Sequence, residues 1–137
     1  MALDPQYTTT PNIASSTLTA ANNVYDGTGT TGTCFTAGAS GSFVGFIKLK
    51  PNNSTANTTA VVARFWINNG SSSATAANNF FYSELVVPTS AASTSNAQPE
   101  LVVPLNIALP AGYKIIWSLA AAPGGGGWVA TGVGGDY

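Results

Sequence analysis

Apolar and polar residues alternate with a period of two along most of this chain. Such alternation is typical of half-buried β-strands, whose successive side chains point to opposite faces of a sheet. Eight stretches carry the pattern, and clusters of Gly, Pro, Asn and Ser that favour turns separate them. The predicted strands span residues 16–20, 31–37, 42–50, 59–68, 79–88, 100–110, 113–121 and 127–133. Because no segment carries a capped helical stripe, the pattern predicts an all-β fold.

The regular spacing of these strands predicts an antiparallel β-sandwich, and eight strands in a chain of 137 residues favour a jelly roll in particular. Residues 16–137 form this predicted domain, which is long enough to fold without a disulfide or a metal. Residues 1–15 are predicted to be an extended N-terminal arm, because Pro5 and Pro11 lack amide donors and the segment shows no periodicity.

The alternation also predicts which side chains share a face of each strand. The predicted sets are Phe43, Ile47 and Leu49; Phe81, Leu85 and Val87; Leu101, Val103, Leu105, Ile107 and Leu109; and Tyr113, Ile115, Trp117 and Leu119. Pro104 interrupts the third set and cannot donate a ladder hydrogen bond, so its strand is predicted to lie at an edge or to contain a bulge.

Some predicted strands are apolar on both faces, which one core does not explain. Val62 and Trp66, for example, share a face with Arg64. Either a loop of the chain covers this outer face, or another subunit does. The second interpretation is favoured, because aromatic residues and Arg are enriched at protein interfaces. Val62, Arg64 and Trp66 are therefore candidate interface residues of a homo-oligomer, a trimer by preference and a dimer next, with Leu3 and Tyr7 as anchors on the arm.

Charge is scarce: four basic and five acidic residues give a net charge of −1. The sequence thus offers no electrostatic case for binding nucleic acid or an anionic membrane. It contains no apolar run of the length that spans a membrane, and its first residues lack the features of a secretory signal, so we expect synthesis in a cytoplasm. Cys34, the single cysteine, is predicted to be a small buried hydrophobe.

The stretch "YDGTGTTGTCFTAG" contains Gly27, Gly29 and Gly32 in the spacing G-x-G-x-x-G, which resembles a dinucleotide-binding fingerprint. That fingerprint needs a preceding strand, a helix starting at its last glycine and an acidic residue about 20 positions later. Here strand and turn residues follow, and no acidic residue follows Asp26 before Glu84. The glycines are therefore predicted to form a turn, and we expect no cofactor.

The remaining inventory argues against catalysis. The chain has no histidine, so the commonest general base is missing and Cys34 lacks a partner for nucleophilic chemistry. Glu84 and Glu100 could form a glycosidase pair, but two solvent-facing charges are the favoured interpretation. Zinc is not expected without histidine and with a single cysteine. Loop carbonyls and Asp26 leave a calcium site open, but no D-x-D-x-D-G loop is present. The segment "PGGGGW" lacks the Lys of a phosphate loop and is predicted to be flexible, or to let another chain approach closely.

Two stretches carry a family resemblance: "PNIASSTLTAANNVYDGTGTTGTCFTAGASGS" over residues 11–42 and "WVATGVGGDY" over residues 128–137. They resemble small proteins of tailed bacteriophages and prophages, which have a similar opening, a "DGTGT" turn and an ending in "GGD" plus an aromatic residue. The resemblance covers the two ends of the sequence and implies a virion component without catalytic residues. We expect a capsid decoration, or cement, protein that binds the major capsid protein on the head surface. The alternative is a tail-fibre or adsorption module that binds a host glycan or surface protein.

Overall fold

The computed structural model describes residues 7–52 and 55–137. Its elements are β1 (Thr10–Leu18), β2 (Gly32–Thr36), β3 (Ser42–Pro51), β4 (Val61–Asn68), a 3₁₀ turn η1 (Ala76–Asn78), β5 (Asn79–Val87), β6 (Leu101–Leu109), β7 (Lys114–Leu119) and β8 (Trp128–Asp136). Seven of these strands coincide closely with predicted ones, and β1 overlaps the eighth. No helix in the described part of the chain is long and apolar enough to cross a membrane.

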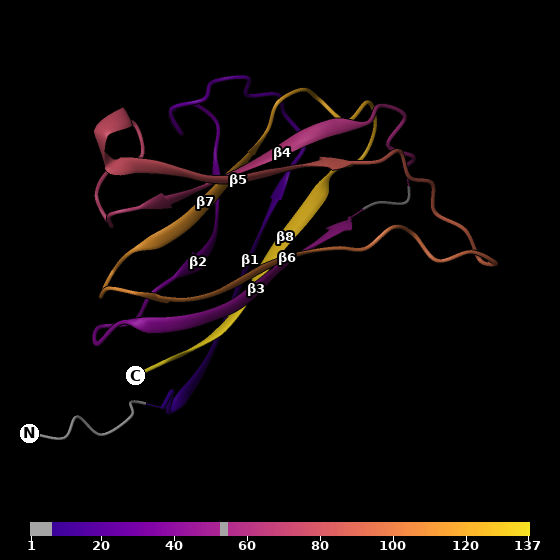
Figure 1. The fold of residues 1–137 in the computed structure, drawn as a ribbon. Helices are drawn as coiled ribbons and strands as arrows, with labels where there is room; N and C mark the ends of the chain where they lie inside the picture. Colours follow the sequence, from indigo (N-terminus) through magenta and orange to yellow (C-terminus); the bar gives the residue numbers. More distant parts are fainter. Residues whose placement is uncertain (1–6, 53–54) are drawn as a thin grey trace, which may run out of the picture.

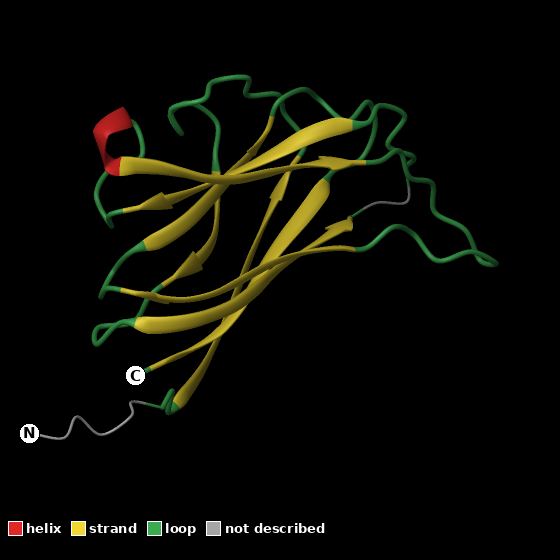
Figure 2. Cartoon of the chain, in the orientation of Figure 1, coloured by secondary structure: helices red, strands yellow, loops and turns green. Residues whose placement is uncertain are grey.

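The strands form two four-stranded antiparallel sheets, in the orders β1-β8-β3-β6 and β2-β7-β4-β5 (Figures 1 and 2). The two sheets enclose a core in which Phe65 and Trp117 stack with ring centroids 6.2 Å apart. Burying each such side chain contributes roughly 1.5–3 kcal/mol, so this core is the main source of stability. The predicted antiparallel β-sandwich is confirmed.

The N-terminal arm is shorter than predicted. Residues 10–15 belong to β1, which pairs with β8 from Thr10↔Asp136 to Leu18↔Trp128. This segment has a weak intrinsic preference for β-structure, but it forms a strand because β8 pairs with it along its whole length. Pro11 is tolerated there because β1 is an edge strand. Tyr7 is 78% exposed, and Leu3 lies outside the described residues.

A bulge at Gly45 changes the predicted face of β3. The pairing of β3 with β8 shifts by one residue between Val44 and Phe46. Val44 therefore joins Ile47 and Leu49 in the core, whereas Phe43, predicted to be with them, is 37% exposed. An extra residue reverses the alternation on one side of a bulge, which a strict period of two does not anticipate.

A second register shift, at Tyr82 of β5, has the same effect. Phe65 pairs with Ser83 and Trp66 with Phe81, which leaves Tyr82 as the extra residue. Phe81 consequently packs on the outer face against Trp66, and the prediction that it shares a face with Leu85 and Val87 is wrong.

Strand β6 follows its prediction. Its alternate apolar residues face the core, it lies at the edge of its sheet, and the register shifts next to Pro104. Asn106 adopts a φ of 52° beside this shift, a conformation that asparagine tolerates better than most residues.

Candidate interaction surface

The loop of residues 19–31, between β1 and β2, covers the outer face of β4 and β7 (Figure 1). The indole nitrogen of Trp66 donates to the carbonyl oxygen of Tyr25 at 3.0 Å, and Nη1 of Arg64 donates to the carbonyl oxygen of Asn23 at 3.1 Å. Trp66 and Arg64 are buried as a result. The interpretation of these two residues as an exposed interface is wrong, because a loop of the same chain covers them. Val62, also on this face, is half-buried.

Short-range hydrogen bonds define the shape of this loop. The side-chain amide of Asn22 donates to the carbonyl oxygens of Thr28 and Thr30 at 2.7 and 2.9 Å. Gly27 and Gly29 adopt φ values of 76° and 78°, which favour glycine. The motif that resembles a nucleotide-binding fingerprint is thus a turn, as predicted.

The loop and β5 together expose an apolar surface on the outer face of the sheet, which we call the aromatic patch. Its members, between 36% and 62% exposed, are Val24, Tyr25, Phe81, Tyr82 and Val86. Phe80 is also exposed, but it pairs with Ile67 on the core side of the sheet and is not part of the patch. The rings of Tyr25 and Phe81 lie 5.9 Å apart, and Phe81 meets buried Trp66 at 5.8 Å. Sequence alternation missed this surface, because Tyr25 lies in a loop and Phe81 lies next to the bulge at Tyr82.

One ion pair lies within the aromatic patch. Nε of Arg64 is 3.3 Å from Oε2 of Glu84, and the guanidinium carbon lies 3.6 Å from the centre of the Tyr25 ring. Tyr25 is therefore held by a cation–π contact as well as by its backbone. Because the two charges neutralise each other, the patch offers a partner a nearly neutral surface.

A second apolar surface lies on the outer face of the other sheet. The register places Ile13, Val133, Phe46 and Pro104 in one row across all four strands. Ile13 is 66% exposed. We call this row the apolar sheet face.

Charged residues border the apolar sheet face at one end. Nζ of Lys48 and Nζ of Lys50 lie 3.2 and 3.9 Å from the carboxylate of Glu100. Glu100 precedes β6 in one sheet, whereas Glu84 belongs to β5 in the other, and each carboxylate has a cationic partner of its own. The two glutamates therefore act as local ion-pair partners.

Asp136 joins three segments near the C-terminus. Its Oδ1 accepts hydrogen bonds from the hydroxyl of Ser42 and, at 2.7 Å, from the side-chain amide of Asn12. The Ser42 oxygen also accepts from the backbone N–H of Gly38 at 2.9 Å. These bonds, the Ser42 contact first, hold the pKa of the Asp136 carboxyl below its usual value. The aspartate of the "GGD" motif thus has a structural role.

Cys34 is fully buried, as predicted, and its thiol points to the carbonyl oxygen of Ile115 at 3.4 Å. Burial raises the pKa of this thiol well above its usual range. Among the described residues, no group of three or more His, Cys, Asp or Glu residues could hold a metal ion.

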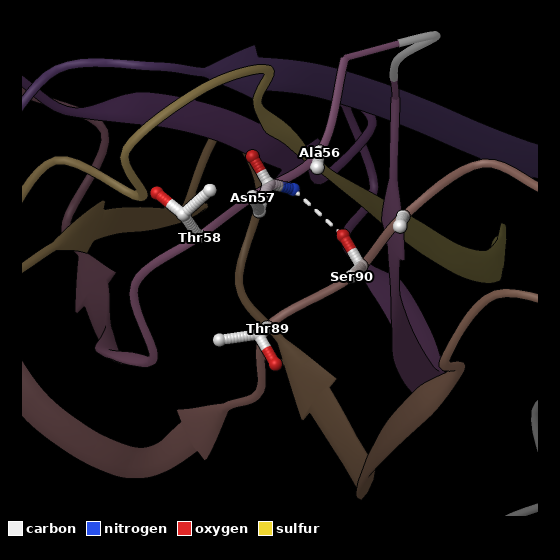
Figure 3. Close-up of a pocket in the computed structure, with 6 residues that line it drawn as sticks. Ala56, Asn57, Thr58, Thr89 and Ser90 are labelled. Carbon is white, nitrogen blue, oxygen red and sulfur yellow. Dashed lines mark hydrogen bonds between the residues drawn. The ribbon is translucent and has the colours of Figure 1, made fainter.

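A shallow hollow of about 450 Å³ lies at one end of the sandwich, lined by residues 56–58 and 89–91 (Figure 3). Asn57 forms its floor: its amide nitrogen donates to the Ser90 hydroxyl at 3.0 Å and to the Gly127 carbonyl oxygen at 3.3 Å. The lining residues are small and lack a titratable side chain, so the hollow offers little for chemistry.

The glycine-rich segment packs beside this hollow. A Cβ atom at Gly125 would lie 1.7 Å from the carbonyl oxygen of Ala56. The close backbone approach anticipated for this segment is therefore made to the chain's own loop before β4.

No family model and no curated protein matches this chain. Among solved structures, a chain from "Structure of infectious bursal disease virus Gt strain" aligns at 16% identity with a TM-score of 0.28. The alignment covers 96% of this chain and 35% of that chain, so the present chain spans about a third of its length.

Proposed function

We propose that this chain is a structural virion protein of the capsid decoration type, which binds the major capsid protein on the outside of a phage head. The observation that carries this proposal is a folded β-sandwich with apolar outer surfaces and only 7% charged residues. Exposed apolar patches on a small domain mark protein–protein contacts. The carboxylates of Asp26, Glu84, Glu100 and Asp136 take part in hydrogen bonds or ion pairs within the chain, and we propose no enzymatic activity.

The placement of the phage-like stretches supports this proposal. Residues 11–42 and 128–137 are far apart in sequence, yet β1 pairs with β8 along its whole length and Asp136 bonds to both Asn12 and Ser42. The resemblance therefore covers one contiguous region of the fold, which is what a shared structural unit requires.

The strand pairing supports the jelly-roll prediction. The pairs β1·β8, β2·β7, β3·β6 and β4·β5 nest inside one another along the chain, and each pair is antiparallel. Such nesting arises when a long hairpin folds into two sheets. We infer a jelly roll, an architecture used in viral capsid domains.

We assign the capsid contact to the apolar sheet face. It runs across all four strands of the sheet, so it suits a flat contact with a shell. Each contact of this kind is modest, but a lattice repeats it many times, and linked contacts bind together far more tightly than any one alone.

The assignment is tested by sedimenting purified protein with undecorated head shells. Ile13→Lys places a charge at the β1 end of the apolar sheet face, on a side chain that is 66% exposed, where it must lose its hydration on binding. We expect this variant to pellet with shells at least about tenfold more weakly than the unchanged protein, because burying an unpaired charge costs more than about 1.4 kcal/mol.

Thr17→Lys is the matched control, since Thr17 is exposed on the same strand and face but lies at its polar end, in the row of Lys50. This variant should bind shells like the unchanged protein. Equal binding by Ile13→Lys would exclude the apolar sheet face, and no binding by the unchanged protein would contradict the capsid role.

A further inference from the structure

We propose that the aromatic patch is the contact between two copies of this chain, which meet patch against patch about a twofold axis. This inference concerns the free protein and does not depend on the capsid role. It replaces the interface expected at Arg64 and Trp66, which the 19–31 loop covers.

The size of the patch fits the apolar centre of a dimer interface. Each aromatic side chain has roughly 150–250 Å² of surface. With five members between 36% and 62% exposed, the patch presents on the order of 400 Å² of apolar area. A stable interface buries about 800 Å² on each partner, with a polar rim around an apolar centre.

The charges of the patch permit self-association. Arg64 forms an ion pair with Glu84 within each chain. When two identical patches meet, every charge at the contact therefore already has a partner of opposite sign. A buried charge without a partner would oppose the contact. The internal pair removes this obstacle.

The patch is also held in a fixed shape before any partner arrives. Tyr25 lies over the Arg64 guanidinium, its carbonyl oxygen accepts from Trp66, and Phe81 rests on the Trp66 ring. Little side-chain freedom remains to be lost on binding, which favours association.

The low charge of the chain favours a second copy as the occupant over a different protein. With a net charge of −1, the free chain has little electrostatic protection against non-specific association. A patch reserved for a later partner would stay exposed in solution, whereas a twofold contact covers it at once.

Side-chain packing, and not strand pairing, makes this contact. The extra residue at Tyr82 distorts β5, the free edge of its sheet, and a bulge disfavours continuing the ladder into another chain. Because a single patch meets itself, the symmetry is a twofold and the product is a dimer, not the trimer that the sequence favours.

The test is sedimentation velocity of the unchanged chain and of two variants, Tyr82→Lys and Val86→Lys. Tyr82 and Val86 are 43% and 62% exposed, so neither substitution disturbs the core. We expect the unchanged protein to sediment at twice its chain mass of 13.8 kDa at micromolar concentration. Each variant should raise the dimer dissociation constant at least about tenfold.

Val102→Lys is the matched control, because Val102 is 53% exposed on β6 in the other sheet. Near-ultraviolet circular dichroism, which reports the three buried tryptophans, confirms folding of every variant. A dimeric control beside monomeric patch variants supports the proposal. An unchanged protein that sediments as a monomer or a trimer overturns it, as does a control that dissociates like Tyr82→Lys. Since no shells are present, these outcomes are separate from the test of the capsid role.

Discussion

The side chain of Asp136 shows how a single residue can bring distant parts of this chain together. Its carboxylate receives hydrogen bonds from Asn12 of β1 and Ser42 of β3. Gly134, two residues earlier, is also constrained, because a Cβ atom there would lie 2.2 Å from the carbonyl oxygen of Phe43. The "GGD" ending is therefore explained by packing, a role that sequence inspection could not assign.

Asp136 should make the stability of the protein sensitive to acid. Its pKa is lowered in the folded state, so the carboxylate stabilises the fold fully above the unfolded pKa of about 3.9. That contribution is lost as the pH falls through the folded pKa. We expect the urea midpoint to drop between neutral pH and pH values below about 4.

Asp136→Asn should have a lower midpoint at neutral pH and a smaller drop in acid. Some acid sensitivity should remain, because Thr28 donates to Asp26 and lowers the pKa of that carboxyl too. A variant that loses as much stability in acid as the unchanged protein would contradict the role of Asp136.

At the scale of elements, the strand positions were predictable for two reasons. Turn-forming residues mark both ends of most strands, and apolar and polar residues alternate regularly within them. The exceptions have local physical causes. Gly45 and Tyr82 are extra residues that reverse a face, and nothing in a pattern of period two marks them. The start of β1 was missed because its order comes from pairing with β8, a partner more than 100 residues away.

At one end of the sandwich, the backbone of the glycine-rich loop at Gly125 packs directly against the backbone of the loop at Ala56. Gly125→Ala would drive a methyl group into the carbonyl oxygen of Ala56, 1.7 Å away, so both loops must shift. We expect a loss of about 2 kcal/mol or more in the free energy of unfolding, measured by urea denaturation.

Gly45→Ala is the comparison for this experiment. A Cβ at Gly45 would meet its nearest atom, the carbonyl oxygen of Val133, at an ordinary 3.5 Å. We expect a change of less than about 1 kcal/mol in either direction. Equal losses in the two variants would show that close loop packing at Gly125 does not matter.

At the scale of the whole molecule, the sandwich was predictable but the location of its interaction surface was not. The alternation correctly placed Arg64 and Trp66 on an outer face, and it left two explanations for that face. Only the structure shows that the 19–31 loop covers it and moves the exposed aromatic surface outward to Tyr25 and Phe81. A loop without periodicity carries no signal of where it will pack.

The proposed role as a head decoration protein is tested most directly by the copy number of this chain in purified virions of a phage whose genome contains this sequence. The measurement is quantitative mass spectrometry of virions against labelled peptides from this chain and from the major capsid protein. A decoration protein repeats with the lattice, so we predict a copy number of the same order as that of the major capsid protein. A copy number matching the tail proteins, or absence from the virion, would contradict the account.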